Sequence, residues 1–281
     1  MINIDFHVHV TPPDIIANWE KYAEREPYFS LLSHSRQNKF ATAEDVAAVL
    51  EVEGNPKFDR AVVFGFAFRD LGLCRYVNDY VIEKVKDSPQ RLIGFISVSP
   101  HGNAAGEIER CYYGGLRGVG ELFPAGQGFD PENEKETSAI TGVCKELSLP
   151  LIIHANEPVG HLYPGKTDVT LRQLETFVSK NQGLNIVLAH WGGGLFFYET
   201  MGEIKEKFRN VYYDTAATPF LYDEKIYRAA KALGLCEKIL FGSDFPLLPH
   251  SRYLDGLEKS GLSAEEKQLI LGGNAQRLLL F

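Results

Sequence analysis

Histidines and carboxylates interrupt several short apolar runs of the chain, and most lie near the end of a run. Asp5, His7 and His9 alternate within residues 2–10, so their side chains project to one face if this run is a strand. Four further residues stand near the carboxyl ends of later runs: Glu121, His154, His190 and Asp244. Imidazoles and carboxylates gathered at one place are the donors that zinc or manganese take in proteins. The residue types therefore predict a divalent metal site.

Each of these residues has an ordinary structural explanation when it is taken alone. A single histidine at a strand end is more often a hydrogen-bonded core residue than a metal ligand. Glu121 or Asp244 alone would more often cap the next helix. Buried carboxylates without a partner are costly, however, and five or six such residues at strand ends are better explained together by a bound metal. In that site Asp5 is a candidate to orient an imidazole.

The elements that must position these residues are eight short apolar runs, separated by longer amphipathic segments. Most runs are nearly continuous in hydrophobicity, which is typical of parallel strands covered on both faces. The expected strands are residues 2–10, 61–68, 92–98, 116–123, 151–154, 186–190, 211–215 and 239–244. The expected helices are residues 43–53, 76–86, 132–147, 169–181, 195–208, 223–233, 251–260 and 264–280. Eight strands, each followed by a helix, predict an α/β fold of the (β/α)8 TIM-barrel type in a single domain, residues 1–281.

The barrel explains the chemistry better than an open doubly wound sheet does. Barrel enzymes place their sites at the carboxyl ends of the strands, and no GxGxxG motif follows the first strand here. Residues 11–40 form an insertion after the first strand that is too long for an ordinary connection. It carries aromatic residues such as Trp19 and Tyr28. We expect it to be a lid or a pocket wall, although the same aromatics would also suit a homodimer interface.

Composition and charge exclude several classes of protein. The chain has 281 residues, of which 44% are hydrophobic and 23% charged, a globular balance. Its 29 basic and 37 acidic residues give a net charge of −8, which argues against a nucleic-acid partner. No apolar run approaches the ~20 residues of a membrane span, and the first residues lack the features of a signal peptide, so we expect a cytoplasmic protein. The four cysteines are far apart and are expected to be buried thiols: Cys74, Cys111, Cys144 and Cys236.

The segments around the candidate ligands resemble the amidohydrolase superfamily, in particular its amidohydrolase-2 branch. The matching segments occur in the family's order: IDFHVHVTP (4–12), GVGELFP (118–124), LIIHANE (151–157), LAHWGGG (188–194), FGSDFP (241–246) and ILGGNAQRLL (270–279). The resemblance implies a distorted barrel that holds one or two divalent ions, with zinc expected and manganese as the alternative.

The resemblance also implies a role for each candidate ligand. It assigns four residues to a first metal ion: His7, His9, His154 and Asp244. His190 would either bind a second ion or polarise the substrate, and Asp244 would accept the proton of a water held by the metal. Glu121 stands where members with two metals often have a carbamylated lysine, and other members bridge two metals with a glutamate. The number of ions therefore stays open at this point.

The resemblance implies a metal-dependent hydrolase that cleaves a C–O or C–N bond of a lactone, ester or amide. The alternative is a non-oxidative decarboxylase of a small carboxylic acid, because the same branch contains such enzymes. Glu121 favours hydrolysis, since an added carboxylate favours a second ion. A barrel that binds a ligand without turnover and a metal-dependent nuclease are further alternatives, and the charge of the chain argues against the second.

Three residues in the expected loops after strands are candidates to contact a small-molecule substrate. Arg69 follows the second strand, and Asn156 and His161 follow the fifth. An arginine there would suit a carboxylate-bearing substrate through bidentate hydrogen bonds. Solvated loop residues are an equally good explanation for each of the three.

Overall fold

Eight parallel strands form the centre of the computed structural model, which describes residues 2–34, 40–51 and 57–280. One sheet has the order β1-β2-β3 and the other has the order β4-β5-β6-β7-β8. The strands are β1 Ile4–His9, β2 Arg60–Phe64, β3 Leu92–Gly94, β4 Val119–Leu122, β5 Leu151–Ile153, β6 Ile186–Leu188, β7 Val211–Asp214 and β8 Ile239–Leu240. All eight lie within the expected runs, except that β2 begins one residue early.

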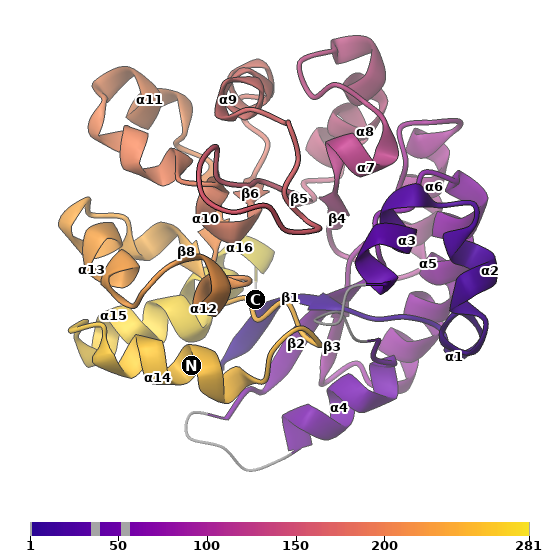
Figure 1. Ribbon diagram of the computed structural model, residues 1–281, viewed down its shortest axis with the longest axis horizontal. Helices are drawn as coiled ribbons and strands as arrows, with labels where there is room; N and C mark the ends of the chain where they lie inside the picture. Colours follow the sequence, from indigo (N-terminus) through magenta and orange to yellow (C-terminus); the bar gives the residue numbers. More distant parts are fainter. Residues whose placement is uncertain (1, 35–39, 52–56, 281) are drawn as a thin grey trace.

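Hydrogen bonds across two seams join these sheets into a distorted (β/α)8 barrel. Between the eighth and first strands, the Asp244 N–H donates to the His7 carbonyl at 2.9 Å. Between the third and fourth strands, the Ile96 N–H donates to the Gly118 carbonyl at 2.9 Å. The strands therefore follow one another around the barrel in chain order, with helices outside them (Figure 1). This is the predicted fold class.

The helices that surround the strands are short in several places. They are α1 Pro13–Ala17, α2 Trp19–Ala23, α3 Pro27–Ser33, α4 Ala43–Glu51, α5 Leu71–Asp87, α6 Ala104–Tyr113, α7 Pro124–Gln127, α8 Glu134–Glu146, α9 Leu171–Lys180, α10 Ala189–Gly192, α11 Gly202–Lys207, α12 Thr218–Leu221, α13 Lys225–Ala232, α14 His250–Lys259, α15 Ala264–Gln268 and α16 Asn274–Leu279. In the described part of the chain, two 3₁₀ segments, η1 Leu195–Thr200 and η2 Cys236–Lys238, and one π-helical segment, η3 Leu269–Gly273, complete the set.

Some of these helices depart from the sequence-based expectation. The expected helix 195–208 is a 3₁₀ segment followed by α11, and the expected helix 264–280 contains a π segment. The last two residues of the expected helix 43–53 lie outside the described residues. A helix was expected after the third strand, but no residue range was assigned to it, because the buried face of α6 consists mostly of small or polar side chains instead of a stripe of large apolar ones.

A cluster of phenylalanine rings packs against the two histidines of β1. The Phe64 ring lies 5.0 Å from the rings of both His7 and His9, measured between centroids. Phe64 also packs on Phe95, which in turn meets Phe6 edge to face. Aromatic rings have few accessible rotamers once they are packed, so this cluster limits the positions that both imidazoles can take.

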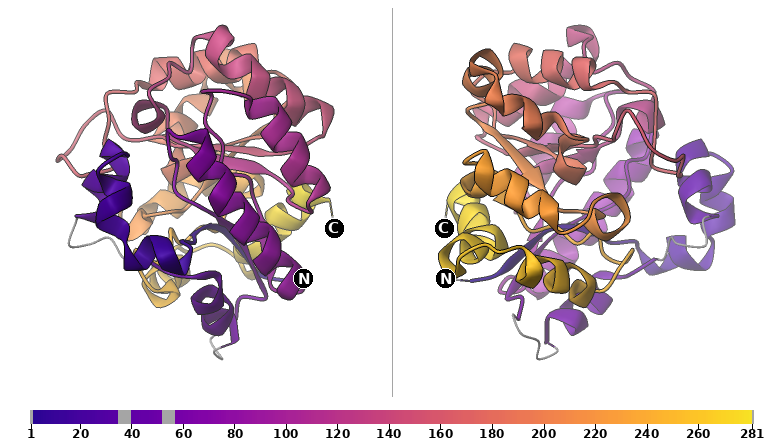
Figure 2. Two further views of the ribbon diagram at one scale, coloured as in Figure 1. Left: turned by 90° about the vertical axis from the view of Figure 1, so that its right-hand side faces the viewer. Right: turned by 60° about the vertical axis from the view of Figure 1, so that its left-hand side comes forward.

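The insertion after β1 folds into the three short helices α1, α2 and α3, at one side of the barrel (Figure 2). Phe29 packs on Phe68, and the Glu26 carboxylate accepts hydrogen bonds from the backbone N–H groups of Arg69 and Asp70, both at 2.8 Å. Leu32 of α3 reaches the cavity described below, as a pocket wall would. Residues 35–39 of the insertion lie outside the described part of the chain.

All four cysteines are buried free thiols, as expected. Within the described ranges, no helix has both the length and the apolar character that crossing a bilayer requires.

Candidate metal centre

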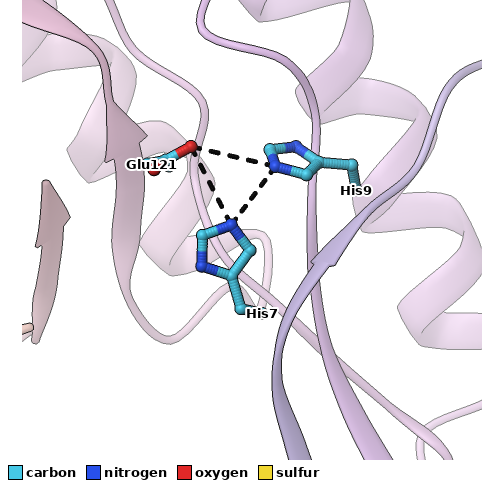
Figure 3. A group of neighbouring side chains, drawn as sticks. All are labelled: His7, His9 and Glu121. Carbon is cyan, nitrogen blue, oxygen red and sulfur yellow. Dashed lines mark hydrogen bonds and ion pairs between the residues drawn. The ribbon is translucent and has the colours of Figure 1, made fainter. Parts of the chain in front are cut away.

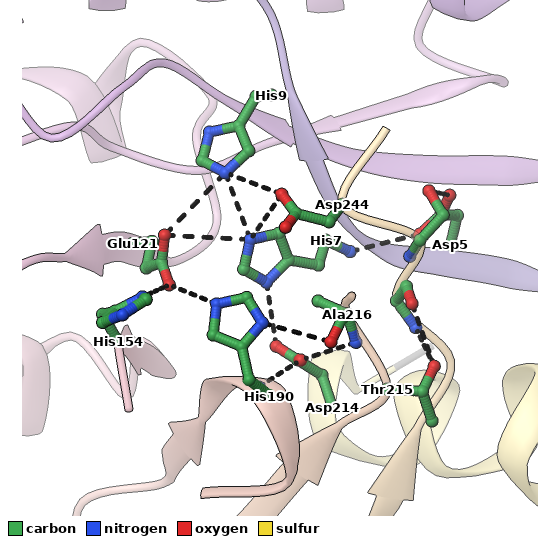
Figure 4. Close-up of polar contacts among 12 residues, drawn as sticks. Asp5, His7, His9, Glu121, His154, His190, Asp214, Thr215, Ala216 and Asp244 are labelled. Carbon is green, nitrogen blue, oxygen red and sulfur yellow. Dashed lines mark hydrogen bonds and ion pairs between the residues drawn. The ribbon is translucent and has the colours of Figure 1, made fainter. Parts of the chain in front are cut away.

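The barrel gathers all six predicted ligands around one point at the carboxyl ends of its strands (Figure 4). They come from five strands or from the short segments after them. The set is His7 and His9 of β1, Glu121 of β4, His154 after β5, His190 after β6 and Asp244 after β8. Asp244 is the most exposed of the six, with 17% of its side chain accessible. Sequence positions up to 237 residues apart therefore form one cluster.

One group of donors consists of His7, His9 and Glu121 (Figure 3). The Nε2 atoms of the two histidines are 3.2 Å apart, and each lies 3.8 Å from Oε2 of Glu121. Asp244 Oδ1 lies 3.3 Å from His9 Nε2. Two donors bound to one ion at about 2.0–2.1 Å in tetrahedral geometry are about 3.3 Å apart. These separations suit one divalent ion among the four side chains.

A second group shares the same glutamate. Oε1 of Glu121 lies 3.0 Å from His154 Nδ1 and 3.3 Å from His190 Nε2. The two oxygens of Glu121 therefore face two different pairs of histidines. A carboxylate with this placement has the geometry to bridge two ions.

Two of the histidines have an acceptor at Nδ1. His7 Nδ1 lies 2.9 Å from Oδ2 of Asp214, and His190 Nδ1 lies 3.1 Å from the carbonyl of Ala216. An acceptor at Nδ1 keeps the proton there in the neutral ring, so Nε2 presents its lone pair to the centre. Both rings are thus oriented as metal ligands.

The other two histidines are held differently. His154 Nε2 lies 2.8 Å from the Gly165 carbonyl, so its Nδ1 is the nitrogen that faces Glu121. His9 Nδ1 is buried and has no partner among the described residues. Its ring stacks on Phe66 with centroids 4.9 Å apart and an interplanar angle of 12°. Packing, instead of a hydrogen bond, orients His9.

The acids and the imidazoles of the cluster shift one another's pKa values. Burial opposes protonation of His7 and His190, but the surrounding carboxylates raise the pKa of His7 to about 9 and that of His190 to about 10. Burial raises the pKa of Glu121 and Asp244, yet the histidines hold the pKa of Glu121 well below its usual value and lower that of Asp244 to about 2. The acids thus remain charged, and the donor set suits a cation that displaces the imidazole protons.

Two buried acids act around this cluster in ways that the motifs do not predict. The Asp214 carboxylate accepts the hydrogen bond of His7 Nδ1, and this residue was not among the predicted ones. Its only signal in the sequence is an acid in the run VYYDT of an expected strand. Asp5, expected to orient an imidazole, accepts hydrogen bonds from the backbone N–H of His7 at 3.3 Å, from the Ser243 N–H at 2.9 Å and from His250 Nε2 at 2.7 Å. It supports the turn that precedes Asp244.

A cavity opens directly above the donors, and its walls are mostly apolar. His9, Glu121, His154, His190 and Asp244 lie at its floor. The walls include Leu32, Phe66, Phe123, His161, Tyr163, Phe220, Leu221 and Leu247. A small molecule in this space would contact the metal ligands at one end and aromatic or aliphatic side chains elsewhere.

The three predicted substrate contacts lie in different surroundings. His161 lines the cavity. Arg69 is exposed and is not part of the lining. The Asn156 side chain is buried, and its Oδ1 accepts hydrogen bonds from the N–H of Thr167 at 3.1 Å and from the hydroxyl of Thr167 at 2.9 Å. Asn156 thus joins the two ends of the loop that carries His161.

Comparisons with curated proteins identify decarboxylases as relatives. The chain is 23% identical to a gamma-resorcylate decarboxylase of Polaromonas sp., over 73% of this chain and 75% of that protein. It is also 23% identical to a 2-amino-3-carboxymuconate-6-semialdehyde decarboxylase of Dictyostelium discoideum, over 99% of this chain and 91% of that protein.

Solved structures share the fold. A 5-carboxyvanillate decarboxylase of Novosphingobium aromaticivorans, complexed with manganese and 4-hydroxy-3-methoxy-5-nitrobenzoic acid, has a TM-score of 0.76 and 16% identity over 100% of this chain and 96% of that one. A probable 2-pyrone-4,6-dicarboxylic acid hydrolase of Acinetobacter baumannii has a TM-score of 0.67 and 17% identity over 100% of both chains. The amidohydrolase family, Amidohydro_2, matches residues 4–281. Since this match includes every strand of the barrel, the chain belongs to the amidohydrolase family.

Proposed function

We propose that this protein is a metal-dependent non-oxidative decarboxylase, which releases the carboxylate of a small carboxylic acid as carbon dioxide. The observation that carries the proposal is the apolar cavity whose floor is the donor cluster. The two decarboxylase relatives support the same reaction. This ranks decarboxylation, the alternative in the sequence-based expectation, above hydrolysis.

The character of the cavity suits the loss of a carboxylate. Decarboxylation converts a charged group into neutral carbon dioxide, so removing that group from water favours the reaction. Phe66, Phe123, Phe220 and Leu247 surround the space, and none of the described lining residues is a lysine or an arginine. The floor can hold one carboxylate while the rest of the substrate contacts apolar side chains. A small aromatic or unsaturated acid with a single carboxylate has this distribution of polarity.

The chain's own residues account for the proton that the reaction needs. When bound, a divalent ion supplies a Lewis acid that holds and polarises the substrate. Cleavage of the C–C bond leaves its electron pair on the substrate carbon, which takes up one proton as carbon dioxide leaves. Asp244 and His190 line the cavity and are the groups that we assign to transfer this proton to the carbon. His7 and His9 keep the donor geometry.

Nitrogen and oxygen donors suit both manganese and zinc. We propose manganese, because the 5-carboxyvanillate decarboxylase with the same fold was solved with manganese. Elemental analysis of protein purified without chelators measures both the metal and its stoichiometry. About one or two equivalents of manganese per chain support the assignment, and zinc at the same stoichiometry contradicts it.

The reaction itself is tested by carbon dioxide release. We would incubate the manganese-loaded protein with 2,6-dihydroxybenzoate and other aromatic acids that carry a single carboxylate, with metal-stripped protein and Asp244→Asn as controls. We expect one carbon dioxide per decarboxylated product, and a rate at least ~100-fold lower in Asp244→Asn, which loses the proton-transfer group. No carbon dioxide from any acid of the panel, together with cleavage of lactones, esters or amides, would overturn the proposal.

Hydrolysis remains the second candidate because of one specific observation. Glu121 faces two pairs of histidines, and a site with two ions is suited to activate water. A pH-stat assay on lactones, esters and amides, run beside the carbon dioxide assay, separates the two reactions.

A further inference from the structure

Asp214 lies at the end of β7, behind the donor cluster and outside both candidate ligand groups. We infer that Asp214 is a positioning residue that sets the histidines of both groups at once. The inference rests on the metal centre of the proposed function and is independent of which reaction that centre performs.

The contacts of Asp214 use both of its oxygens. The side chain is fully buried. Oδ2 lies 2.9 Å from His7 Nδ1, whereas Oδ1 accepts hydrogen bonds from the backbone N–H groups of His190 at 2.9 Å and Ala216 at 3.0 Å (Figure 4). One carboxylate therefore contacts a side chain from the first group and the backbone of a residue from the second.

The contact with His7 determines which of its nitrogens faces the metal. A carboxylate can only accept, so the neutral imidazole must keep its proton on Nδ1. Nε2, which lies 3.2 Å from His9 Nε2, then carries the free lone pair. The negative charge of Asp214 also makes the imidazole a stronger donor toward a cation.

The contacts with His190 and Ala216 act on both the backbone and the ring of His190. His190 has φ 56° and ψ 48°, a left-handed conformation that a residue with a Cβ adopts only when its surroundings hold it there. The hydrogen bond from its N–H to Asp214 is one such restraint. Asp214 also fixes Ala216, whose carbonyl bonds the ring at Nδ1 and leaves Nε2 facing Glu121.

An amide of the same shape cannot replace the carboxylate. In Asp214→Asn, an amide oxygen turned toward His7 leaves the NH2 group against the N–H groups of His190 and Ala216. The opposite orientation presents the NH2 group to Nδ1 of His7, which must then accept, and the proton of the neutral ring moves to Nε2. Each orientation disturbs one of the two ligand groups.

A matched control separates this effect from a general loss of stability. Glu199 is another buried carboxylate that contacts β7, where it accepts hydrogen bonds from the Tyr213 hydroxyl at 2.8 Å and from Lys238 Nζ at 2.6 Å. None of its contacts involves a candidate metal ligand. Glu199→Gln therefore removes a buried charge beside the same strand but leaves the donor cluster intact.

The decisive measurement is the affinity of the full chain for manganese, by equilibrium dialysis with elemental analysis. We expect Asp214→Asn to bind manganese about 10- to 100-fold more weakly than the wild type. We expect Glu199→Gln to stay within about twofold, because its contacts lie outside the ligand set. Equal affinities of Asp214→Asn and the wild type overturn the inference.

A second measurement needs no variant and covers the case in which Asp214→Asn fails to fold. In zinc-loaded wild-type protein with ¹⁵N-labelled histidine, long-range NMR correlations should show His7 protonated at Nδ1 and metal-bound at Nε2. An unprotonated Nδ1 overturns the inference. If the wild type binds metal but releases no carbon dioxide, only the proposed reaction is overturned. If the wild type binds neither manganese nor zinc, both proposals are overturned.

Discussion

Two buried glutamates of this protein, Glu107 of α6 and Glu121 of β4, are surrounded in opposite ways. Glu107 accepts hydrogen bonds from Arg110 Nε and Nη2, both at 2.8 Å, from Asn78 at 2.8 Å and from Arg75 at 3.1 Å. The neighbours of Glu121 in the donor cluster are histidines. Burial penalises both acids, yet the pKa of Glu107 is lowered to about 2 and that of Glu121 lies well below its usual value.

The difference lies in the permanence of the opposing charge. Arginine stays protonated at every pH that a protein meets, so Glu107 is neutralised by its own chain. A histidine is charged only while it holds a proton, and each proton that leaves frees a donor for a metal. We interpret Glu107 as a structural acid. We interpret Glu121 as an acid whose permanent counter-charge would be a bound metal ion.

The largest effect that distinguishes the two acids is expected from Glu121→Gln. This variant removes the carboxylate shared by both ligand groups, so we expect metal affinity to fall by about 100-fold or more. Elemental analysis after dialysis measures this loss of metal. Unchanged metal content would remove Glu121 from the centre.

Glu107→Gln should lower the stability of the fold and leave metal binding intact. Removing one partner of a buried ion pair leaves Arg110 partly unpaired, and we expect the free energy of unfolding to fall by about 3 kcal/mol. The metal content of the folded protein should equal that of the wild type, since Glu107 contacts no candidate ligand. Urea denaturation of the metal-free protein gives the first value, and elemental analysis of the folded, metal-loaded protein gives the second. A loss of metal without a loss of stability would abolish the distinction between the two acids.

The stability difference between Glu107→Gln and the wild type should depend on pH. The folded-state pKa of Glu107 is about 2, below its ordinary value of 4.5. The ionised side chain therefore contributes its full stabilisation above the unfolded-state pKa, and the contribution is lost as the pH falls from 4.5 toward 2. The difference should be complete at pH 7 and clearly smaller at pH 3. A difference independent of pH would mean that shape, instead of charge, makes Glu107 important.

The sequence contains enough information to predict the barrel and the clustering of the six candidate donors, because both depend on simple periodicities. Buried parallel strands are continuous apolar runs, and a histidine or acid at the end of such a run stands out. Asp214 does not, since one acid near a strand end is consistent with a helix cap, and its partner His7 lies 207 positions away. Glu107 is partly hidden for a similar reason: Arg110 follows it by three positions on α6, but Arg75 and Asn78 meet it only through the packing of α5 against α6.

Loop residues were the least predictable part of the site. The sequence places Arg69, Asn156 and His161 after strands, but the path of each loop decides where a side chain points. Glu26 of the insertion binds the backbone at Arg69, while Thr167 binds the side chain of Asn156. Both contacts join segments that no local pattern connects, and His161 is the one of the three that lines the cavity.

The smallest expected effect concerns the two arginines that contact Glu107, which should contribute unequally to the stability of the fold. Arg75 lies 3.1 Å from Glu107, but 60% of its side chain is exposed, whereas Arg110 is 35% exposed and contacts both carboxylate oxygens. Water screens an exposed pair, so we expect Arg75→Ala to lower the free energy of unfolding by only about 0.5 kcal/mol. Arg110→Ala should cost several times more, because it leaves a buried acid with a single exposed cation. Equal losses of unfolding free energy in the two variants would show that the number of arginines near Glu107 determines its contribution to stability. The buried geometry of its pair with Arg110 would then not distinguish it from Glu121.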